Sequence, residues 1–506
     1  MMSSFYRKIK TSFSWEGLAI VVILLLGFVL RLRQYLTGRS LWLDEAMLAL
    51  NIVNRDFVGL SQPLDYNQGA PLGFLLVEKF FNIMFGKHEL VLRFFPFIMG
   101  VAALGLFYLL LRHTTTGISL LAGLISFAVG PELIYYSSEV KQYIVDVTVT
   151  ILLLLLTYPF LEGHIKKRNY IFLGLTGVLA LWFSHPALFV LAGIGIGIFV
   201  QALKHREQSQ RSSLLIMATV WLANLSVLYF VSLRGLSQNT FLLDYWQENF
   251  MPLPPWLDWG WFGNTFAALI QNQIGLYALA WLVFLIMLLG LLTLFNKNRL
   301  YAGIIVMIFI FAMIASGLRL YPLGGRLSLF LVPLMIILIS QFLSAVEQRM
   351  NLHYKYGGYL AVLLSGYLLF APVSESFSNF LNPKYFEHIR PSMATLSENW
   401  REGDVLFVSN GAVPAFRFYA DRYGLGRLTF QSSDPSDYLE PTKILSNLKS
   451  LNGKKRVWVL ITHVYENKEF NEKDYLLNYL DTIGVKKREF RSPGTSVYLL
   501  LYDLSS

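Results

Sequence analysis

The chain has 506 residues and a mean hydropathy of +0.50, with 55% hydrophobic and only 15% charged residues. A soluble domain usually carries about 25% charged residues, so this composition excludes a wholly soluble protein. The formal net charge is +10, but the basic residues form short clusters between apolar runs, which is typical of membrane-protein loops and argues against nucleic-acid binding.

Eleven apolar runs predict a polytopic α-helical membrane protein, because about 20 apolar residues cross a bilayer as a helix. The runs centre on residues 15–35, 90–111, 118–136, 143–161, 170–184, 187–203, 213–233, 275–295, 300–318, 327–345 and 357–374. Lys and Arg in the N-terminal segment and in alternate loops predict a cytoplasmic N-terminus in a multi-pass protein of the plasma (inner) membrane. An odd number of spans then places the C-terminus outside the cytoplasm.

The density of charge changes near residue 382. Residues 382–506 hold 32 Asp, Glu, Lys and Arg residues, whereas the 381 residues before them hold 42. We therefore expect a transmembrane module at 1–381, with a long first outer loop at about 36–89, and a soluble extracytoplasmic domain at 382–506.

The first outer loop carries two adjacent carboxylates, Asp44 and Glu45, directly after the apolar Leu41-Trp42-Leu43. An apolar pattern at helical spacing follows, so Asp44 is predicted near a helix N-terminus, where a negative charge is stabilised. The alternative interpretation is a simple helix N-cap, since Asp is common at that position.

Several blocks of the chain resemble bacterial GT-C glycosyltransferases, relatives of the protein O-mannosyltransferases and of the lipid A aminoarabinose and galacturonic acid transferases. The blocks are SLWLDEA (40–46), QPL (62–64), GAPLGF (69–74), FGKHELVLRFFPFIMG (85–100), YYSSEVKQY (135–143) and YPLGGRLSLFLVP (321–333). The resemblance covers roughly residues 15–345, and the number of spans and the outward C-terminal domain also fit it.

The resemblance implies transfer of a sugar from a polyprenyl-phosphate donor to a lipid, glycan or protein acceptor on the outer face of the membrane. A lipid phosphate leaves without protonation, so the enzyme needs one base for the acceptor hydroxyl and cations for the phosphate. By matching motif, Asp44 is the base and Glu45 is a contact for the acceptor or a metal. Attack opposite the leaving phosphate would invert the anomeric centre. The requirement for a divalent metal stays open.

Lys141 and Arg326 are the candidate cations for the donor phosphate. Arginine offers a bidentate fork to phosphate and lysine a point charge. For Lys141 the alternative is an ordinary ion pair with Glu139 or Asp146. For Arg326 the alternative is a snorkelling interfacial residue, although Gly324-Gly325 before it would permit close approach of the backbone to a ligand.

Four further residues are candidates for the sugar site. Glu139 and Tyr143 are four residues apart and would share a face of a helix. Tyr321 lies in the YPLGGR block, and His185 lies in an outer turn, FSHPAL. A lone histidine in a tight turn is more commonly structural.

The C-terminal domain contains strand-like runs at 404–409, 456–462 and 496–502, with helical patterns at 412–421 and 443–451 between them. This alternation predicts a small α/β domain. Cysteine is absent from the chain, so no disulfide and no thiolate metal site are expected. Acceptor recognition and support of the outer loops are both compatible with such a domain.

Two other functions compete with a transferase. A transporter or flippase of lipid-linked sugars would show internal repeats and paired broken helices near mid-membrane, and the sequence shows neither. A degenerate, non-catalytic binding protein would tolerate the loss of Asp44.

Overall fold

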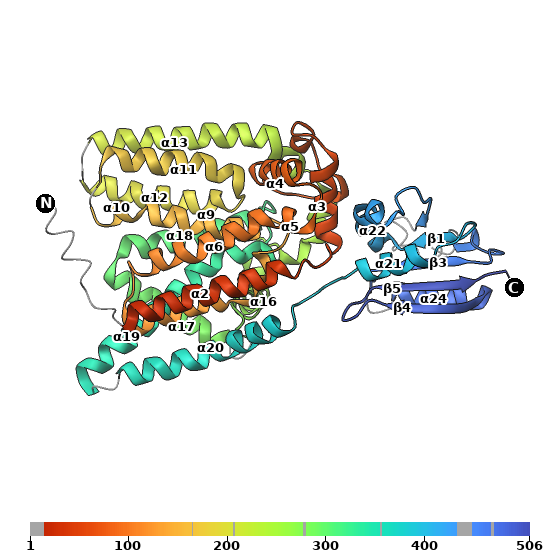
Figure 1. Ribbon diagram of the computed structural model, residues 1–506. Coiled ribbons are helices and arrows are strands. Elements are labelled where there is room, and N and C mark those ends of the chain that lie inside the picture. Colours follow the sequence, from red (N-terminus) through yellow and green to blue (C-terminus); the bar gives the residue numbers. More distant parts are fainter. Residues whose placement is uncertain are drawn as a thin grey trace. The chain divides into compact units, whose positions relative to one another are not determined.

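The computed structural model describes residues 15–163, 165–205, 208–276, 280–354, 357–432, 448–466 and 470–505 (Figure 1). Contacts between residues divide the chain into two compact units. The membrane unit comprises Met1–Thr37, Asp56–Gly86 and Leu90–Pro383, and the C-terminal unit comprises Gly38–Arg55, Lys87–Glu89 and Lys384–Ser506. Two pieces of the first loop therefore belong to the same compact unit as the C-terminal domain.

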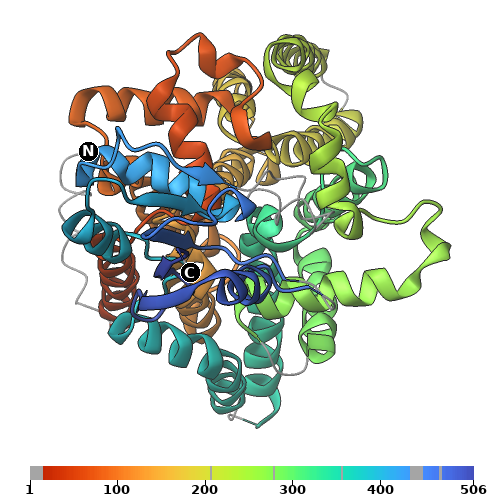
Figure 2. The ribbon, with the colours of Figure 1, turned by 90° about the vertical axis from the view of Figure 1, so that its right-hand side faces the viewer.

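The membrane unit is a bundle of apolar helices, which Figure 2 shows nearly end-on. Its α-helices are α2 (Trp15–Leu36), α4 (Leu72–Phe85), α5 (Glu89–Leu92), α6 (Phe94–Leu111), α7 (Gly117–Val129), α8 (Pro131–Tyr136), α9 (Tyr143–Leu156), α10 (Tyr158–Leu161), α11 (Lys167–Phe183), α12 (Ala187–His205), α13 (Gln208–Leu228), α14 (Arg234–Ser237), α15 (Thr240–Tyr245), α16 (Trp259–Ala268), α17 (Ala280–Lys297), α18 (Arg299–Gly317), α19 (Val332–Tyr354) and α20 (Gly357–Leu381). Shorter 3₁₀ or π segments are η1 (Gly59–Ser61), η2 (Asp65–Asn67), η3 (Tyr229–Leu233), η4 (Gln247–Asn249), η5 (Pro255–Leu257), η6 (Leu269–Gln273) and η7 (Gly325–Leu331).

The predicted apolar runs fall largely on helix, and the multi-pass prediction is confirmed. Residues 277–279, in the run at 275–295, lie outside the described part of the chain. In the described part of the chain, eight helical stretches are long and apolar enough to cross a membrane, and two shorter apolar helices cover Gly117–Val129 and Ala187–Leu203. The number of full-length spans is therefore smaller than eleven. The run at 118–136 is divided because Pro131 cannot donate a backbone hydrogen bond, so α7 ends and α8 begins there.

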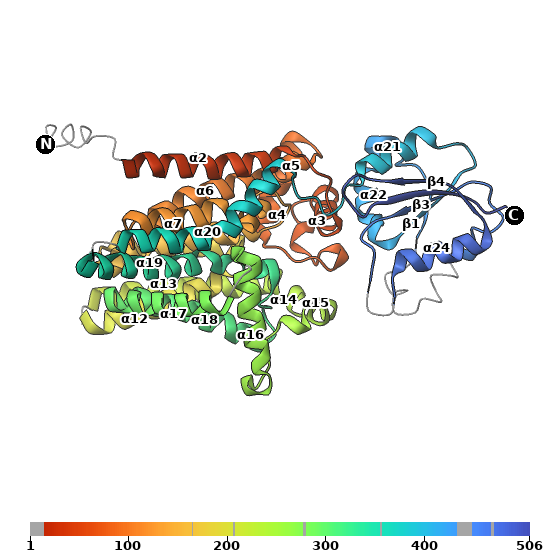
Figure 3. The ribbon, with the colours of Figure 1, turned by 90° about the horizontal axis from the view of Figure 1, so that it is seen from below.

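Helix α19 lies at the centre of the bundle and packs against α7, α17 and α20. Of its membrane-length stretch, 83% is buried within the protein, compared with 22% for α2. Gly290 of α17 faces the carbonyl of Leu338 in α19 so closely that a Cβ atom would lie 1.9 Å from that oxygen. Small residues permit such close approach of helices in lipid. Figure 3 shows α16 crossing the direction of the bundle helices.

The C-terminal unit contains a five-stranded sheet in the order β2-β1-β3-β5-β4. Its strands are β1 (Val405–Val408), β2 (Gln431–Ser432), β3 (Val457–Ile461), β4 (Val485–Arg491) and β5 (Tyr498–Asp503). Strands β2, β1 and β3 are parallel, whereas β5 is antiparallel to both β3 and β4. Helices α21 (Arg390–Asn399) and α22 (Val413–Tyr419) lie on one face of the sheet and α24 (Glu472–Ile483) on the other (Figure 3). The 3₁₀ segments η8 (Asn410–Ala412) and η9 (Ala420–Tyr423) flank α22.

The predicted α/β character of this domain is confirmed, with strands at all three predicted positions. The helix predicted at 412–421 is α22 with its flanking turns, and most of the helix predicted at 443–451 lies outside the described residues. Strand β4 was not predicted. It reads VKKREFR, and all but one of its side chains are exposed, because an edge strand needs only one face to pack.

Candidate active site

The first-loop helix α3 (Leu43–Asn54) carries Asp44 and Glu45 in its first turn. The helix begins at Leu43, and Trp42 occupies the N-cap position without a side-chain cap bond. Asp44 therefore lies one residue inside the helix, and the N-cap interpretation is wrong. Its side chain is half-buried, whereas Glu45 is buried. A carboxylate in this first turn is stabilised by the helix dipole and keeps access to water.

Glu387 supplies the missing cap from a part of the chain more than 300 residues away. Its Oε2 accepts a hydrogen bond from the Leu43 backbone N–H at 3.2 Å. The first backbone N–H groups of a helix have no partner within the helix, so a carboxylate is a strong substitute. Glu387 is itself buried, and this bond fixes the start of the helix that carries Asp44.

His463 forms a hydrogen bond with the other carboxylate oxygen of Glu387. The two side chains are 2.8 Å apart, from Nδ1 to Oε1. Burial lowers the pKa of His463, but the hydrogen bond to Glu387 and the negative charges of Glu387 and Asp44 outweigh it and raise that pKa above its ordinary value. The backbone of His463 has φ of 47°, a region sparsely populated by residues other than glycine and often kept at functional sites.

Other first-loop residues of the C-terminal unit are tied to its α/β fold by further polar contacts. The Leu41 N–H donates to the Tyr419 hydroxyl at 2.9 Å. Glu89, which is fully buried, pairs with Arg390 at 3.1 Å and with Arg422 at 3.2 Å. These bonds tie both first-loop pieces, residues 38–55 and 87–89, to the domain.

Lys141 and Arg326 belong to the membrane unit, and Arg326 lies there beside two tyrosines. The guanidinium carbon of Arg326 lies 5.6 Å from the centre of the Tyr143 ring, and the rings of Tyr143 and Tyr136 meet edge-on with centroids 5.3 Å apart. Glu139, Glu132 and Arg326 all lie close enough to Tyr136 to act on it electrostatically. Arg326, Glu139 and the two tyrosines are thus neighbours.

Lys141 is buried, and its ammonium group donates to the Gln68 side-chain oxygen at 2.6 Å. Gln68 lies in the first loop, just before the GAPLGF block, and was not among the predicted site residues. The prediction that Glu139 and Tyr143 share a helical face is wrong, because residues 137–142 form turns between α8 and α9. The hydroxyls of Ser137 and Ser138 bond to carbonyls of the preceding turn, which competes with helix continuation.

The turn before Arg326 is built by its glycines and by Tyr321. Gly325 has φ of 48°, and a Cβ atom on Gly324 would lie 2.0 Å from the Asn249 amide nitrogen. Both glycines are therefore required by the protein's own packing. The Tyr321 hydroxyl donates to the Leu327 carbonyl at 2.8 Å, so this tyrosine fastens the turn that presents Arg326.

His185 lies in the turn between α11 and α12. Burial lowers its pKa to about 4, so the imidazole is neutral at physiological pH. Its Nε2 atom is buried and has no hydrogen-bond partner among the described residues. A role in the sugar site stays a prediction for this residue.

The predicted site residues thus fall into two groups: Asp44 and Glu45 in the C-terminal unit, and Lys141, Glu139, Tyr143, Tyr321, Arg326 and His185 in the membrane unit. Sequence reasoning missed Glu387, His463 and Gln68. A polar Gln68 beside a recognisable block was a usable signal, whereas Glu387 and His463 had none. Within the described residues, no three His, Cys, Asp or Glu side chains are grouped so as to hold a metal ion, and no ligand set is assigned.

Comparison with known proteins supports the fold by structure alone. No family model matches the chain, and no curated protein matches it in sequence. The crystal structure of ArnT from Cupriavidus metallidurans bound to undecaprenyl phosphate superposes with a TM-score of 0.54 at 12% identity, covering 97% of this chain and 98% of that one. The Archaeoglobus fulgidus oligosaccharyltransferase, in complex with Zn and sulfate, gives a TM-score of 0.54 at 14% identity over 87% of this chain and 67% of that one.

Both of these proteins are GT-C glycosyltransferases. This chain has their fold, over nearly its entire length in the case of ArnT. The fold and the structural likeness implied by the sequence resemblance are therefore confirmed.

Proposed function

We propose that this protein is a membrane glycosyltransferase that moves a sugar from a polyprenyl-phosphate donor to an acceptor hydroxyl on the outer face of the plasma membrane. The observation that carries the proposal is the fold likeness to ArnT over both full chains, in a structure that holds undecaprenyl phosphate. The half-buried Asp44, in the motif SLWLDEA at a helix start, supplies a group suited to the chemistry.

In the proposed reaction, the acceptor oxygen attacks the anomeric carbon as the bond from that carbon to the phosphate oxygen breaks. Asp44 accepts the acceptor's proton, and the electron pair of the broken bond leaves on the polyprenyl phosphate. Lys141 and Arg326 stabilise the negative charge on that phosphate. Attack on the face opposite the phosphate inverts the anomeric configuration. Glu387 and His463 act as positioning residues, because they hold the start of the helix that carries Asp44.

The deciding experiment compares the wild type with Asp44→Asn in detergent, using a panel of polyprenyl-phosphate sugars and a membrane extract as the source of acceptor. Removing a general base typically costs about 10²–10⁴-fold in rate, so transfer and release of lipid phosphate should fall by that factor. Asp56→Asn, an exposed first-loop carboxylate, is the matched control. Normal transfer by Asp44→Asn would assign the base to another residue.

The competing function, a transporter of lipid-linked sugars, gives a different result in the same preparation. Wild type would then turn over no donor, yet it would move a lipid-linked sugar across liposomes. The orientation can be tested separately, since the chain has no cysteine of its own. A cysteine introduced at an exposed position of the C-terminal unit, such as Glu402, should react in intact cells with a reagent that cannot cross membranes.

A further inference from the structure

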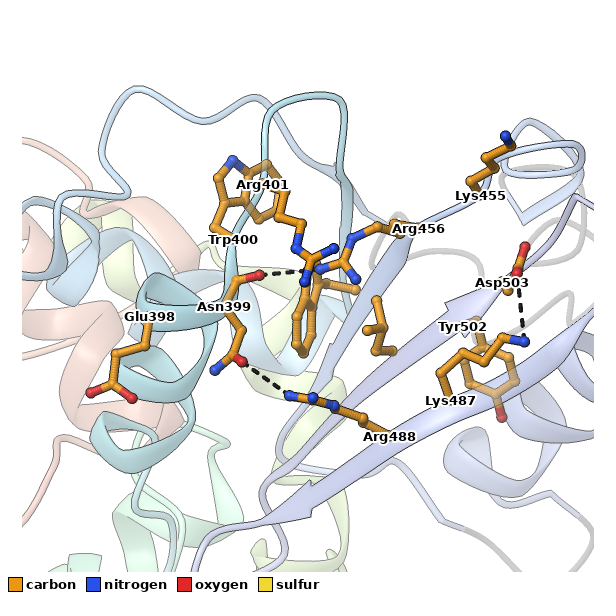
Figure 4. Close-up of a pocket in the computed structure, with 12 residues that line it drawn as sticks. Glu398, Asn399, Trp400, Arg401, Lys455, Arg456, Lys487, Arg488, Tyr502 and Asp503 are labelled. Atoms are coloured by element: carbon orange, nitrogen blue, oxygen red, sulfur yellow. Dashed lines mark hydrogen bonds and ion pairs between the residues drawn. The ribbon is translucent and has the colours of Figure 1, made fainter.

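One pocket of the C-terminal unit lies at the edge of the sheet where β1 and β3 begin and β5 ends, and it has a volume of about 350 Å³ (Figure 4). Small-molecule sites usually range from about 300 to 1,000 Å³, so this pocket suits a single sugar ring or a similar group. Its walls come from the end of α21, the segment that leads into β1, the start of β3 and the charged edge strand β4.

Cations outnumber carboxylates in this pocket. Five basic side chains line it, but only Glu398 and Asp503 contribute negative charge to the lining. Lys487 pairs with Asp503 at 3.6 Å. Figure 4 shows Glu398 turned away from the arginines.

Three cations of the lining have no carboxylate partner among the described residues: Arg401, Lys455 and Arg488. Arg488 donates to the neutral Asn399 side chain at 3.0 Å. A guanidinium whose only partner is a neutral amide keeps its full charge and spare N–H donors. The pocket therefore presents uncompensated positive charge to a ligand.

A buried carboxylate, Asp404, accepts hydrogen bonds from several residues that line the pocket. Arg456 meets both of its oxygens, at 2.7 and 3.2 Å, and the indole N–H of Trp458 donates to it at 2.8 Å. The Arg401 backbone N–H also donates to Asp404, at 3.0 Å. Because these bonds hold the segment that leads into β1, the pocket is formed before a ligand arrives.

An aromatic ring accompanies the charge, since the half-buried Trp400 lies at the rim of the pocket beside Arg401 (Figure 4). An indole face packs well against an apolar ring surface, and arginine binds carboxylate or phosphate with its planar fork. A flexible acidic peptide has no ring for the tryptophan and loses more freedom on binding. The combination therefore favours a ring that carries an anionic group.

We propose that this pocket binds an anionic saccharide, meaning a sugar ring that bears a carboxylate or a phosphate. Resting on the proposed transferase function, we assign this saccharide to the acceptor. The domain would then hold an acidic glycan through Arg401 and Arg488 while a hydroxyl of the same acceptor is glycosylated.

The test measures binding of glucuronate and glucose 6-phosphate to the full-length protein in detergent by ligand-observed NMR, with glucose, inorganic phosphate and a hexaglutamate peptide as comparisons. The double variant Arg401→Glu/Arg488→Glu reverses two of the uncompensated charges. We expect it to weaken binding of both anionic sugars by about 10-fold or more, since each charge-assisted bond is worth roughly a factor of ten. Arg427→Glu, an exposed charge reversal outside the pocket, should bind like the wild type.

Four results would overturn the assignment: no binding of either anionic sugar, equal binding by the double variant, equal binding of inorganic phosphate, or tighter binding of the peptide. Donor turnover, measured on the same samples with the membrane extract as the source of acceptor, separates this proposal from the transferase proposal. If the anionic sugars bind and no donor is consumed, the pocket assignment stands and the transferase function fails. If donor is consumed and the sugars do not bind, the transferase function stands and the pocket assignment fails.

Discussion

The two groups of candidate site residues are held in place by different kinds of interaction. In the C-terminal unit, Asp44 sits at the start of a helix whose first N–H is bound by Glu387, which is itself bound by His463. In the membrane unit, Arg326 lies against the ring of Tyr143, and Lys141 bonds to a neutral amide. The start of the helix that carries Asp44 is thus held by hydrogen bonds to a carboxylate, whereas an aromatic ring contacts Arg326 and a neutral amide contacts Lys141.

This difference concerns how the first loop is held in place. Ion pairs within a folded domain position a group accurately, because each partner has its own hydrogen bonds. The C-terminal domain therefore supports the first-loop helix that carries Asp44.

After Asp44→Asn, the largest effect is expected on the membrane side of this comparison. Arg326→Gln removes a charge and a fork of donors from the proposed phosphate site, so kcat/KM for the donor should fall by about 10²–10³-fold. Arg326→Lys keeps the charge without the fork and should recover only part of the rate. Arg234→Gln, at an exposed arginine of α14, is the control and should leave kcat/KM unchanged. If Arg326→Gln left donor kinetics intact, Arg326 would be an interfacial anchor.

A smaller effect is expected from removing Glu387, which binds the start of the helix that carries Asp44. Glu387→Ala leaves the Leu43 N–H and the His463 ring without their carboxylate partner, which costs about 1–3 kcal/mol of stability. Because Asp44 is then held less well, kcat should fall by about 10-fold with little change in the donor KM. Glu402→Gln, an exposed glutamate of the same unit, is the control. A loss confined to KM would contradict a positioning role.

The stability that the His463–Glu387 contact contributes depends on pH, because His463 changes its charge. Its pKa is raised in the folded state, so the stabilisation is fully present below the unfolded pKa and is lost as pH rises through the folded pKa. His463→Gln should therefore lower the melting temperature more at pH 6 than at pH 9. The side chain is 46% exposed, so solvent screening limits the difference to about 1 kcal/mol. Equal losses at both pH values would leave only a packing role for His463.

The smallest effect concerns Glu78 of α4, a buried carboxylate of the membrane unit with no hydrogen-bond partner for either oxygen among the described residues. Burial raises the pKa of Glu78 well above its ordinary value. The folded protein then keeps a proton that the unfolded chain releases above about pH 4, so stability falls as pH rises through the folded pKa. Glu78→Gln, which resembles the protonated form, should unfold at the same temperature or higher at pH 8. A large loss of stability there would mean that Glu78 is charged in the native state.

Much of the fold could be predicted from the sequence, because apolar runs and charge density are local properties of the chain. The apolar runs are largely helical, and all three predicted strands exist, since each combines apolar and β-branched residues over a short length. The edge strand β4 was not predicted, because its exposed lysines and arginines interrupt the alternating apolar pattern of a strand. The run at 118–136 was predicted as one helix because only its apolar length was considered. Pro131 divides it into α7 and α8.

Sequence patterns alone point to the residues of the candidate site: Asp44 and Glu45 in one block, Lys141, Glu139 and Tyr143 in another, and Arg326 after paired glycines. The surroundings of these residues become visible only in the folded protein. Glu387 caps the helix of Asp44 from 344 positions away along the chain, and Gln68 reaches Lys141 from 73 positions away. Such pairs are invisible to local patterns, because a hydrogen bond depends on distance in space and folding alone brings its two partners together.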